Sequence, residues 1–157
     1  MNAGMDDLYR EVILDHHRSP RCREPLACAD AEAAGRNPSC GDEVTLQLAF
    51  DEDRISGISV RTAGCAIATA SGSILGELLV GRTLEEARRL AEAFRLIMHD
   101  EHAELADDLD PGDLEVLTGV RKFPVRVKCA LLPWITMLEA VTARDEGRTS
   151  GPATTEV

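Results

Sequence analysis

The chain has 157 residues and a formal net charge of −11, with 44% hydrophobic and 29% charged residues. This length suits a single domain that buries its own hydrophobic core without disulfide bonds. The negative charge argues against a nucleic-acid partner and against an anionic membrane surface, because both carry charge of the same sign.

The cysteines and the N-terminus indicate a reducing compartment. The number of cysteines is five, which is odd, and their spacing is irregular. No apolar run reaches the roughly 18 residues of a membrane span, and residues 1–7 are acidic where a secretory signal would be basic. We therefore expect a cytoplasmic protein whose thiols serve metal binding or thiol chemistry rather than disulfides.

The chain opens with an amphipathic helix. Apolar side chains recur at helical spacing over residues 8–16, and Ser19-Pro20 ends the pattern. His16 and its neighbour His17 are expected to cap or flank this helix.

A sheet follows the first helix. From residue 44 to residue 60 the hydrophobic period changes to two on either side of an acidic turn, Asp51-Glu52-Asp53. This pattern predicts an antiparallel hairpin. Residues 27–34 are expected to supply a third strand.

Two further helices follow the hairpin. Residues 66–80 are small and apolar and are closed by Gly81, which predicts a helix packed tightly against the sheet. Thr83-Leu-Glu-Glu86 is a capping box that begins another helix. A short helix is expected after Asp110-Pro111, whose residues can cap it.

The last helix is expected over residues 125–144, where Pro133 removes a backbone donor and predicts a kink or a later start. Residues 145–157 resemble a disordered tail. We expect one domain over residues 1–157 with a structured core over about residues 5–144. The predicted fold class is α+β, with a small antiparallel sheet of about three strands packed against a layer of helices.

Three cysteines and one aspartate are candidate metal ligands. Gly41, between Cys40 and Asp42, lets the thiol and the carboxylate turn toward one point. Cys65 stands at a helix start, where the helix dipole favours a thiolate, and Cys129 lies on the last helix. Three thiolates and one carboxylate make the four ligands that tetrahedral zinc requires. By spacing alone, buried free thiols remain the better interpretation, because the chain has no Cys-x-x-Cys pair.

Three motifs follow one another in the order Asn37-Pro-Ser-Cys-Gly-Asp42, Gly64-Cys-Ala-Ile67 and Phe123-Pro-Val-Arg-Val-Lys-Cys129. In this order they resemble the cysteine motifs of the U-type iron-sulfur cluster assembly proteins, the IscU/SufU/NifU N-domain family. The resemblance covers residues 5 to about 143 and implies a SufE/NifU-like form of the α+β fold.

Within that family the chain is most similar to the SufU branch. The interval from Cys65 to Cys129 is long, and Lys128 stands where the IscU branch has a histidine. The resemblance implies four zinc ligands, Cys40, Asp42, Cys65 and Cys129. It also implies that Cys40 accepts sulfur from a SufS-type cysteine desulfurase, with downstream Suf scaffold proteins as further partners.

Arg126 lies one helical turn before Cys129 and matches an arginine of the SufU motif. We expect it to hold Asp42 or to stabilise Cys40 during transfer, with a plain surface arginine as the alternative. Ala68, where the second motif more often has serine, is a departure with small expected effects.

Two functions remain open at this point. One is a zinc-dependent sulfurtransferase, an enzyme-like sulfur acceptor that works with the desulfurase. The other is a scaffold on which a [2Fe-2S] cluster is built, with iron bound by the same four side chains. A purely structural zinc domain is disfavoured, because an Asp ligand and a loop cysteine suit ligand exchange better than a closed site.

The remaining candidates are two cysteines and two histidines. Cys22 and Cys28 have no partner at ligand spacing and are interpreted as incidental thiols. His99 and His102 are spaced to share a helix face as a metal pair, with a solvated charged turn as the favoured alternative.

Overall fold

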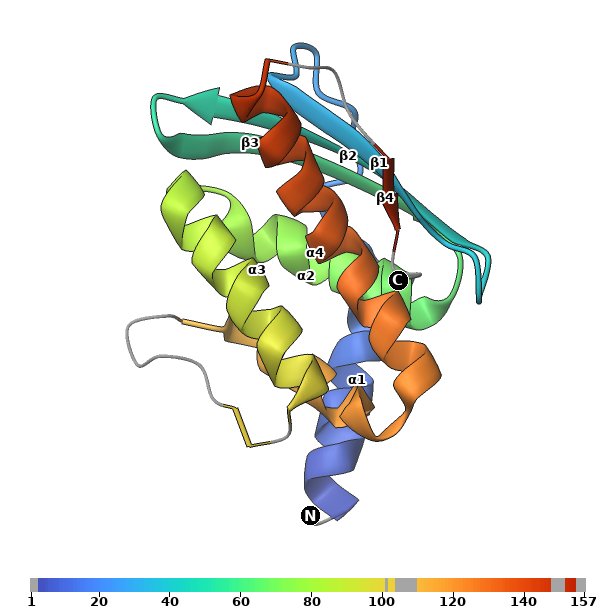
Figure 1. The fold of residues 1–157 in the computed structure, drawn as a ribbon. Coiled ribbons are helices and arrows are strands. Elements are labelled where there is room, and N and C mark those ends of the chain that lie inside the picture. The colour runs from blue at the N-terminus through green and yellow to red at the C-terminus, as the bar shows by residue number, and fades with distance from the viewer. Residues whose placement is uncertain (1–2, 101, 104–109, 148–151, 155–157) are drawn as a thin grey trace.

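The computed structural model describes residues 3–100, 102–103, 110–147 and 152–154. The helices are α1 (Ala3–Arg18), α2 (Ala66–Leu79), α3 (Leu84–His99), the 3-10 helix η1 (Gly112–Lys122) and α4 (Pro124–Asp145) (Figure 1). The strands are β1 (Ala31–Asn37), β2 (Asp42–Asp51), β3 (Arg54–Ala63) and β4 (Pro152–Thr154). Among the described residues, no helix is both long and apolar enough to cross a membrane.

The sheet has the order β3-β2-β1-β4. β2 pairs with β1 and with β3 in antiparallel fashion, so the predicted hairpin and the predicted third strand are confirmed. The third strand begins at Ala31, later than the 27–34 segment expected for it. The predicted α+β class with three antiparallel strands is therefore correct.

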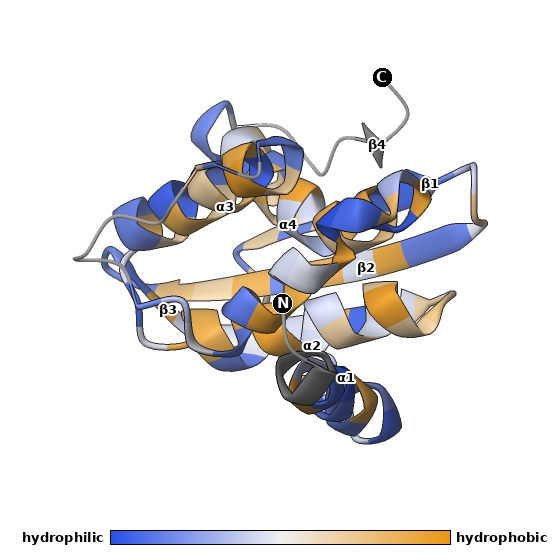
Figure 2. Cartoon of the chain, turned by 90° about the horizontal axis from the view of Figure 1, so that it is seen from below, coloured by the Kyte–Doolittle hydropathy of each residue, from blue (hydrophilic) through white to orange (hydrophobic). Residues whose placement is uncertain are grey.

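Helices cover one face of the sheet. Side chains alternate between buried and exposed along β1 and along most of β2, so these strands turn one face to the helices and the other to solvent. α2 packs on β3, and α4 packs on β1 and β2, while α1 lies against α2 and η1 (Figure 1). Figure 2 shows hydrophobic residues concentrated on the strands, α2 and α4, with many hydrophilic residues on α1. This two-layer packing brings the β1–β2 turn close to α2 and α4.

The core between α3 and α4 contains the chain's single tryptophan. Trp134 is fully buried, and its ring lies 5.5 Å from the ring of Phe94 at a tilt of 58°. α3 begins as predicted, because the Thr83 hydroxyl accepts from the Glu86 N–H and the Glu86 carboxylate accepts from the Thr83 N–H. The predicted short helix is the 3-10 helix η1, and the Asp110 carboxylate accepts from the Gly112 N–H before it.

The later start expected for α4 is wrong. The helix begins at Pro124, where a proline needs no helical partner for its missing N–H, and it continues past Pro133. Pro133 leaves the Cys129 carbonyl without its usual i+4 donor. On either side of that position the Ser71 hydroxyl donates to the Ala130 carbonyl at 2.5 Å, and the Thr136 hydroxyl donates to the Leu132 carbonyl at 2.8 Å.

The expected disordered tail differs in part from the structure. α4 continues to Asp145, and Pro152–Thr154 forms the short strand β4, which runs parallel to β1 from the Ala34 position onward. Backbone pairing with an open sheet edge needs no particular side chains, which is why composition misses it. Residues 148–151 and 155–157 lie outside the described part of the chain.

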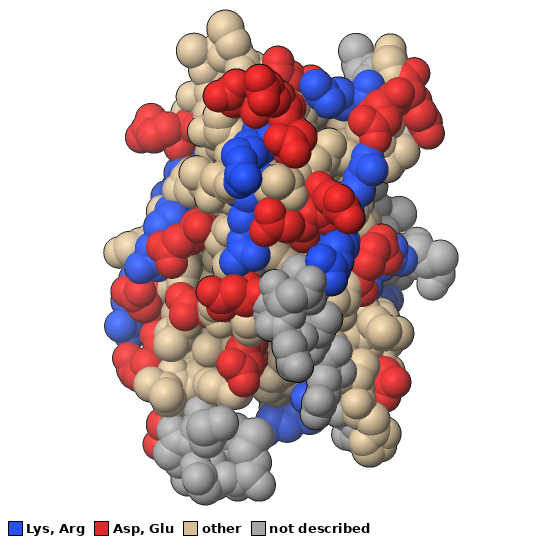
Figure 3. Space-filling model, turned by 90° about the vertical axis from the view of Figure 1, so that its left-hand side faces the viewer, with Lys and Arg blue, Asp and Glu red and all other residues tan. Residues whose placement is uncertain are grey.

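Acidic and basic residues are mixed on the surface. On the face in Figure 3, Lys and Arg side chains alternate with Asp and Glu side chains rather than forming one basic field. On this face the charges of the two signs are therefore interspersed.

Candidate metal centre

The turn between β1 and β2 presents the first two candidate ligands. Asn37 ends β1 and Asp42 begins β2, and the N–H groups of Cys40 and Gly41 both donate to the Asn37 carbonyl, at 3.2 and 2.8 Å. Gly41 has φ +74°, a conformation that suits glycine. The turn leaves Cys40 half-buried and directs the Asp42 side chain, which is 1% exposed, toward the helices.

Asp42 is held against the start of α2. Its Oδ1 accepts from the Cys65 backbone N–H at 2.8 Å, and its Oδ2 lies 3.8 Å from the Cys65 Sγ. Gly64 has φ +155°, and a Cβ added there would lie 2.2 Å from Asp42 Oδ1 and 2.9 Å from Asp42 Cα. Only glycine therefore allows this approach between β2 and the segment that leads into α2.

Cys65 is the N-cap residue of α2. Its backbone is extended, with φ −74° and ψ 165°, and its sulfur accepts from the Ala68 N–H at 3.4 Å. The predicted position at a helix start is therefore correct.

Cys129 supplies a buried sulfur from α4. It is fully buried, and its Sγ lies 3.5 Å from the Cys40 Sγ. The ligand atoms of Cys40, Asp42 and Cys129 all lie within 4.8 Å of one another. The Cys65 sulfur falls outside this closest group but adjoins it through the Asp42 carboxylate. All four predicted residues thus meet where the β1–β2 turn, α2 and α4 come together.

The surroundings of Cys129 disfavour a free thiolate. Burial raises the pKa of the Cys129 thiol far above its usual value, and hydrogen bonding to the Asp42 carboxylate raises it further. A cation shared with the carboxylate would reverse this balance, because it stabilises both negative groups at once.

Arg126 reaches the same cluster from the first turn of α4. Its guanidinium is exposed, and its pKa is raised, chiefly by hydrogen bonding to Cys129 and then by the nearby sulfur groups of Cys65, Cys129 and Cys40. The side chain is exposed at the edge of the cluster, so its expected role, holding Asp42 or stabilising Cys40, stays a prediction.

Asn37 is a site residue that the sequence reasoning missed. It is fully buried, and its Nδ2 donates to Asp42 Oδ2 at 3.4 Å and points at Cys129 Sγ from 3.6 Å. Its Oδ1 has no hydrogen-bond partner among the described residues. Its position could have identified it, because Asn37 is the first residue of the six-residue motif that ends in Asp42. The turn within this motif brings its two ends together.

Comparison with known proteins agrees with this geometry. The family described as NifU-like N terminal domain matches residues 8–130 of the chain. The chain belongs to this family.

Named relatives and a solved structure extend the match. The chain is 38% identical over 146 residues to the zinc-dependent sulfurtransferase SufU of Bacillus subtilis, which covers 93% of this chain and 97% of that protein. It is 36% identical over 139 residues to the iron-sulfur cluster assembly scaffold protein IscU of Streptococcus pyogenes serotype M1, covering 88% and 86% of the two chains. A crystal structure of FiSufU from Fervidobacterium islandicum AW-1, described as a cluster assembly scaffold protein for the SUF system, has a TM-score of 0.77 at 32% identity and covers 89% and 99%. These matches confirm the family resemblance read from the three motifs.

The donor set of this family member suits a tetrahedral thiophilic metal. Sulfurs that share one zinc lie about 3.8 Å apart when each Zn–S bond is about 2.3 Å. The 3.5 Å between the sulfurs of Cys40 and Cys129, and the 3.8 Å from the Cys65 sulfur to Asp42 Oδ2, come close to that spacing. Soft thiol donors select zinc or iron-sulfur chemistry over magnesium or calcium.

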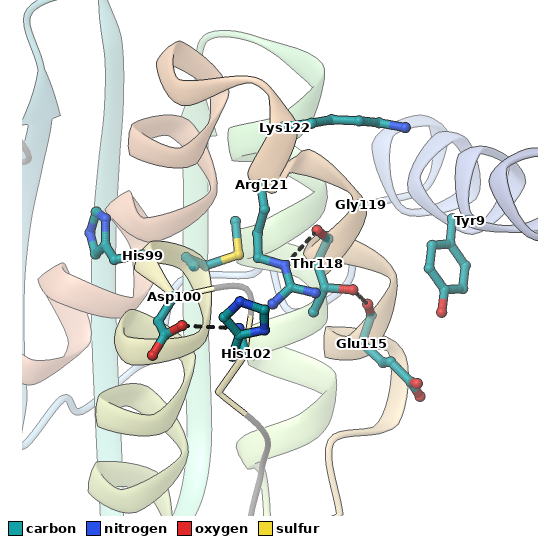
Figure 4. A pocket seen from close by; sticks show the side chains of 10 residues that line it. Tyr9, His99, Asp100, His102, Glu115, Thr118, Gly119, Arg121 and Lys122 are labelled. Carbon is teal, nitrogen blue, oxygen red and sulfur yellow. Dashed lines mark hydrogen bonds between the residues drawn. The ribbon is translucent and has the colours of Figure 1, made fainter. Parts of the chain in front are cut away.

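The histidine pair does not form a metal site. α3 ends at His99, so His102 lies in a turn beyond the helix rather than on the same helical face. Both line a pocket of about 820 Å³ with Asp100, but in Figure 4 the two imidazole rings do not face a common point. The Asp100 carboxylate accepts from the His102 backbone N–H at 3.0 Å, which favours the capped polar turn. Glu101 lies outside the described residues.

Cys22 and Cys28 lie apart from the donor cluster. Both are free thiols; Cys28 is exposed, and burial raises the pKa of Cys22.

His16 does more than flank α1: it is 1% exposed and lies 2.7 Å from Ser73 Oγ and 2.9 Å from Asp113 Oδ2. The helix-face pattern placed His16 inward, but its two partners are 57 and 97 residues away in the sequence.

Proposed function

We propose that this protein is a zinc-dependent sulfurtransferase of iron-sulfur cluster assembly that accepts persulfide sulfur on Cys40 from a SufS-type cysteine desulfurase. The observation that carries the proposal is the cluster of three thiols and one carboxylate in which Cys40 alone lies on a turn. Family membership and the name of the Bacillus subtilis relative support it.

The cluster divides into fixed donors and one movable donor. Asp42 is held by the Cys65 N–H, and Cys65 caps α2. Cys129 is fully buried in α4. Cys40 is half-buried beside Gly41, so it can leave the cluster without disturbing a helix or a strand.

Zinc, when bound by these four side chains, keeps the thiols deprotonated near neutral pH and protects them from oxidation. In the transfer step, the Cys40 thiolate attacks the outer sulfur of the desulfurase persulfide. A new S–S bond forms at Cys40, the S–S bond on the desulfurase breaks, and the desulfurase cysteine leaves as a thiolate. One sulfur atom moves, one thiolate replaces another, and no external oxidant or reductant is needed.

Arg126 has a defined part in this scheme. Its guanidinium lies near the sulfurs of Cys129 and Cys65, and it stays charged at every working pH. We assign it to stabilise the Cys40 thiolate while that sulfur is away from the other donors. An amine on a flexible lysine stem would supply the charge without the planar set of donors.

A scaffold for a [2Fe-2S] cluster is the second candidate. The names of the Streptococcus pyogenes and Fervidobacterium islandicum relatives favour it, and thiolate donors suit iron-sulfur clusters as well as zinc. Both candidates belong to iron-sulfur cluster assembly of the IscU/SufU type.

One experiment separates the two. The purified protein is assayed for metal and absorbance, and then for stimulation of a SufS-type desulfurase by wild type, Cys40→Ala and the matched exposed-thiol variant Cys28→Ala. Sulfur transfer predicts colourless protein with one zinc per chain and stimulation that Cys40→Ala abolishes and Cys28→Ala retains. A brown protein with cluster absorbance and no stimulation would establish the scaffold instead.

A second variant tests the carboxylate ligand. Asp42→Ala removes the only oxygen donor of the cluster, and zinc affinity should fall at least tenfold in a chelator competition. Unchanged zinc affinity would remove Asp42 from the ligand set.

A further inference from the structure

A small basic hollow lies between the end of α1, β3 and α2, separate from the candidate metal ligands. Its volume is about 170 Å³. Basic side chains come from the end of α1 and the loop after it, and hydroxyl groups come from β3 and α2. Those used in the argument are His17, Arg18, Arg23, Thr62, Thr69 and Ser73. We propose that this hollow binds one phosphate group.

The charges around the hollow favour an anion. Its lining contains no acidic residue. Two carboxylates on the same helices, Asp15 of α1 and Glu77 of α2, are paired with the Arg21 guanidinium at 2.8 and 3.3 Å. Within the described part of the chain, Arg18 and Arg23 have no ion pair with a carboxylate within 4.0 Å. The two guanidinium groups are thus available to an oxyanion, which they suit as planar multiple donors.

Neutral donors complete the site. The hydroxyl groups of Thr62 and Thr69 have no hydrogen bond to any described residue and are half-buried at the hollow. Ser73 is different, since its Oγ accepts from the Arg21 N–H at 2.9 Å and lies 2.7 Å from His16 Nδ1. The Ser73 hydroxyl is therefore already used within the protein, and the two threonine hydroxyls are the ones available to a ligand.

A backbone donor lies at the same place. The Val60 N–H points away from β2, because it donates to the Cys22 carbonyl at 2.7 Å. Alternate residues of an antiparallel strand direct their N–H groups to the same side, so the N–H of Thr62 also points to the outer edge of β3. The loop covers this edge at Val60 and leaves it open at Thr62, beside the hollow.

Size restricts the ligand to one small group. At about 30 Å³ for each water in the liquid, 170 Å³ holds between five and six waters. This is room for one tetrahedral oxyanion, and it is below the roughly 300 Å³ at which pockets for drug-sized molecules begin. The net charge of −11 does not prevent binding, because ionic strength near 0.15 M screens charges beyond about 8 Å.

The hollow adjoins the candidate metal centre through α2. The Thr69 N–H donates to the Cys65 carbonyl at 3.1 Å, so the phosphate-facing threonine lies one helical turn after a candidate ligand. A phosphate bound there would therefore change the environment of the first turn of α2 without touching the sulfur cluster.

The test is an amide NMR titration of the full chain with potassium phosphate against potassium chloride at constant ionic strength. Saturable shifts at the Thr62 and Thr69 amides are expected for phosphate alone. The double variant Arg18→Gln/Arg23→Gln should bind at least tenfold more weakly. The control Arg10→Gln/Arg61→Gln removes the same charge from exposed positions outside the hollow and should bind like wild type.

Further arms separate a phosphate site from simple charge attraction. Thr62→Val/Thr69→Val keeps all charges and should also bind at least tenfold more weakly. Adenosine monophosphate that binds more tightly than inorganic phosphate identifies a larger phosphate ester as the source, and weaker binding identifies free phosphate. The proposal is overturned if no shift saturates, if acetate binds as tightly as phosphate, or if both arginine pairs weaken binding equally.

Discussion

The backbone N–H of Cys65 donates to Oδ1 of Asp42 at 2.8 Å, joining two candidate ligands that are 23 residues apart in the sequence. This hydrogen bond links the first residue of β2 to the N-cap of α2. It orients the carboxylate so that Oδ2 faces the sulfurs, which leaves that oxygen for a metal. The site therefore depends on the close approach of the two segments.

Gly64→Ala should disrupt the centre. A methyl group there would overlap the Asp42 carboxylate, so we expect the free energy of unfolding to fall by about 1–3 kcal/mol and zinc affinity to fall at least tenfold. Denaturant unfolding and chelator competition measure the two effects. Gly81→Ala is the matched control, because φ is also positive there but an added Cβ meets nothing within 4 Å. Equal loss of zinc affinity in both variants would refute a specific clash.

Arg126→Gln should slow sulfur transfer while leaving zinc bound. The guanidinium lies near the sulfurs, and an arginine is not a metal donor, so we expect desulfurase stimulation to fall about tenfold, equivalent to about 1.4 kcal/mol, at unchanged metal content. Lys122→Gln, an exposed change of the same charge just before α4, should leave the rate unaffected. If Arg126→Gln loses zinc, its role is in holding the cluster.

His16→Ala should lower the free energy of unfolding more than His17→Ala does. A carboxylate accepts, so Nε2–H of His16 donates to Asp113 at 2.9 Å, and Nδ1 pairs with the Ser73 hydroxyl at 2.7 Å. Loss of both bonds at a buried position should cost about 2–4 kcal/mol in urea unfolding. The exposed His17→Ala should stay within about 0.5 kcal/mol of wild type.

The capping box of α3 should give a pH-dependent contribution to stability. The hydrogen bond from the Thr83 hydroxyl lowers the pKa of Glu86 below its usual 4.5, and the Thr83 N–H adds to this. A lowered pKa means stability that is present above pH 4.5 and lost as pH falls through the folded value. Thr83→Ala should cost about 1 kcal/mol at pH 7, and the difference from wild type should narrow below pH 4. Thr83→Ser should retain the wild-type dependence of the unfolding free energy on pH. If the difference in unfolding free energy between Thr83→Ala and wild type is the same at every pH, the link to Glu86 is wrong.

Local signals predicted the fold well. The period of two around Asp51-Glu52-Asp53 identified the hairpin, and the Thr83 capping box identified the start of α3. Both depend on residues close together in the sequence. β4 could not be predicted in this way, because its pairing with β1 uses backbone groups across more than a hundred residues.

The site was predicted from motif order rather than from geometry. Residue types suggested the four ligand candidates, the order of the family motifs selected them, and the structure brings them to one place, with Cys65 slightly outside the closest group. Asn37 was missed because its contact with Cys129 spans 92 residues and leaves no local pattern. For His99 and His102 the structure has the favoured polar turn, because α3 ends at His99 and His102 lies beyond the helix.

The buried, tilted contact between Trp134 and Phe94 gives the protein an intrinsic fluorescent probe. Trp134 is the chain's only tryptophan and lies five residues after Cys129 on α4, an axial rise of about 7.5 Å. Its indole N–H has no hydrogen-bond partner among the described residues, so its emission depends on packing against α3. Intrinsic fluorescence can therefore follow how metal loading or partner docking alters α4, without any attached dye.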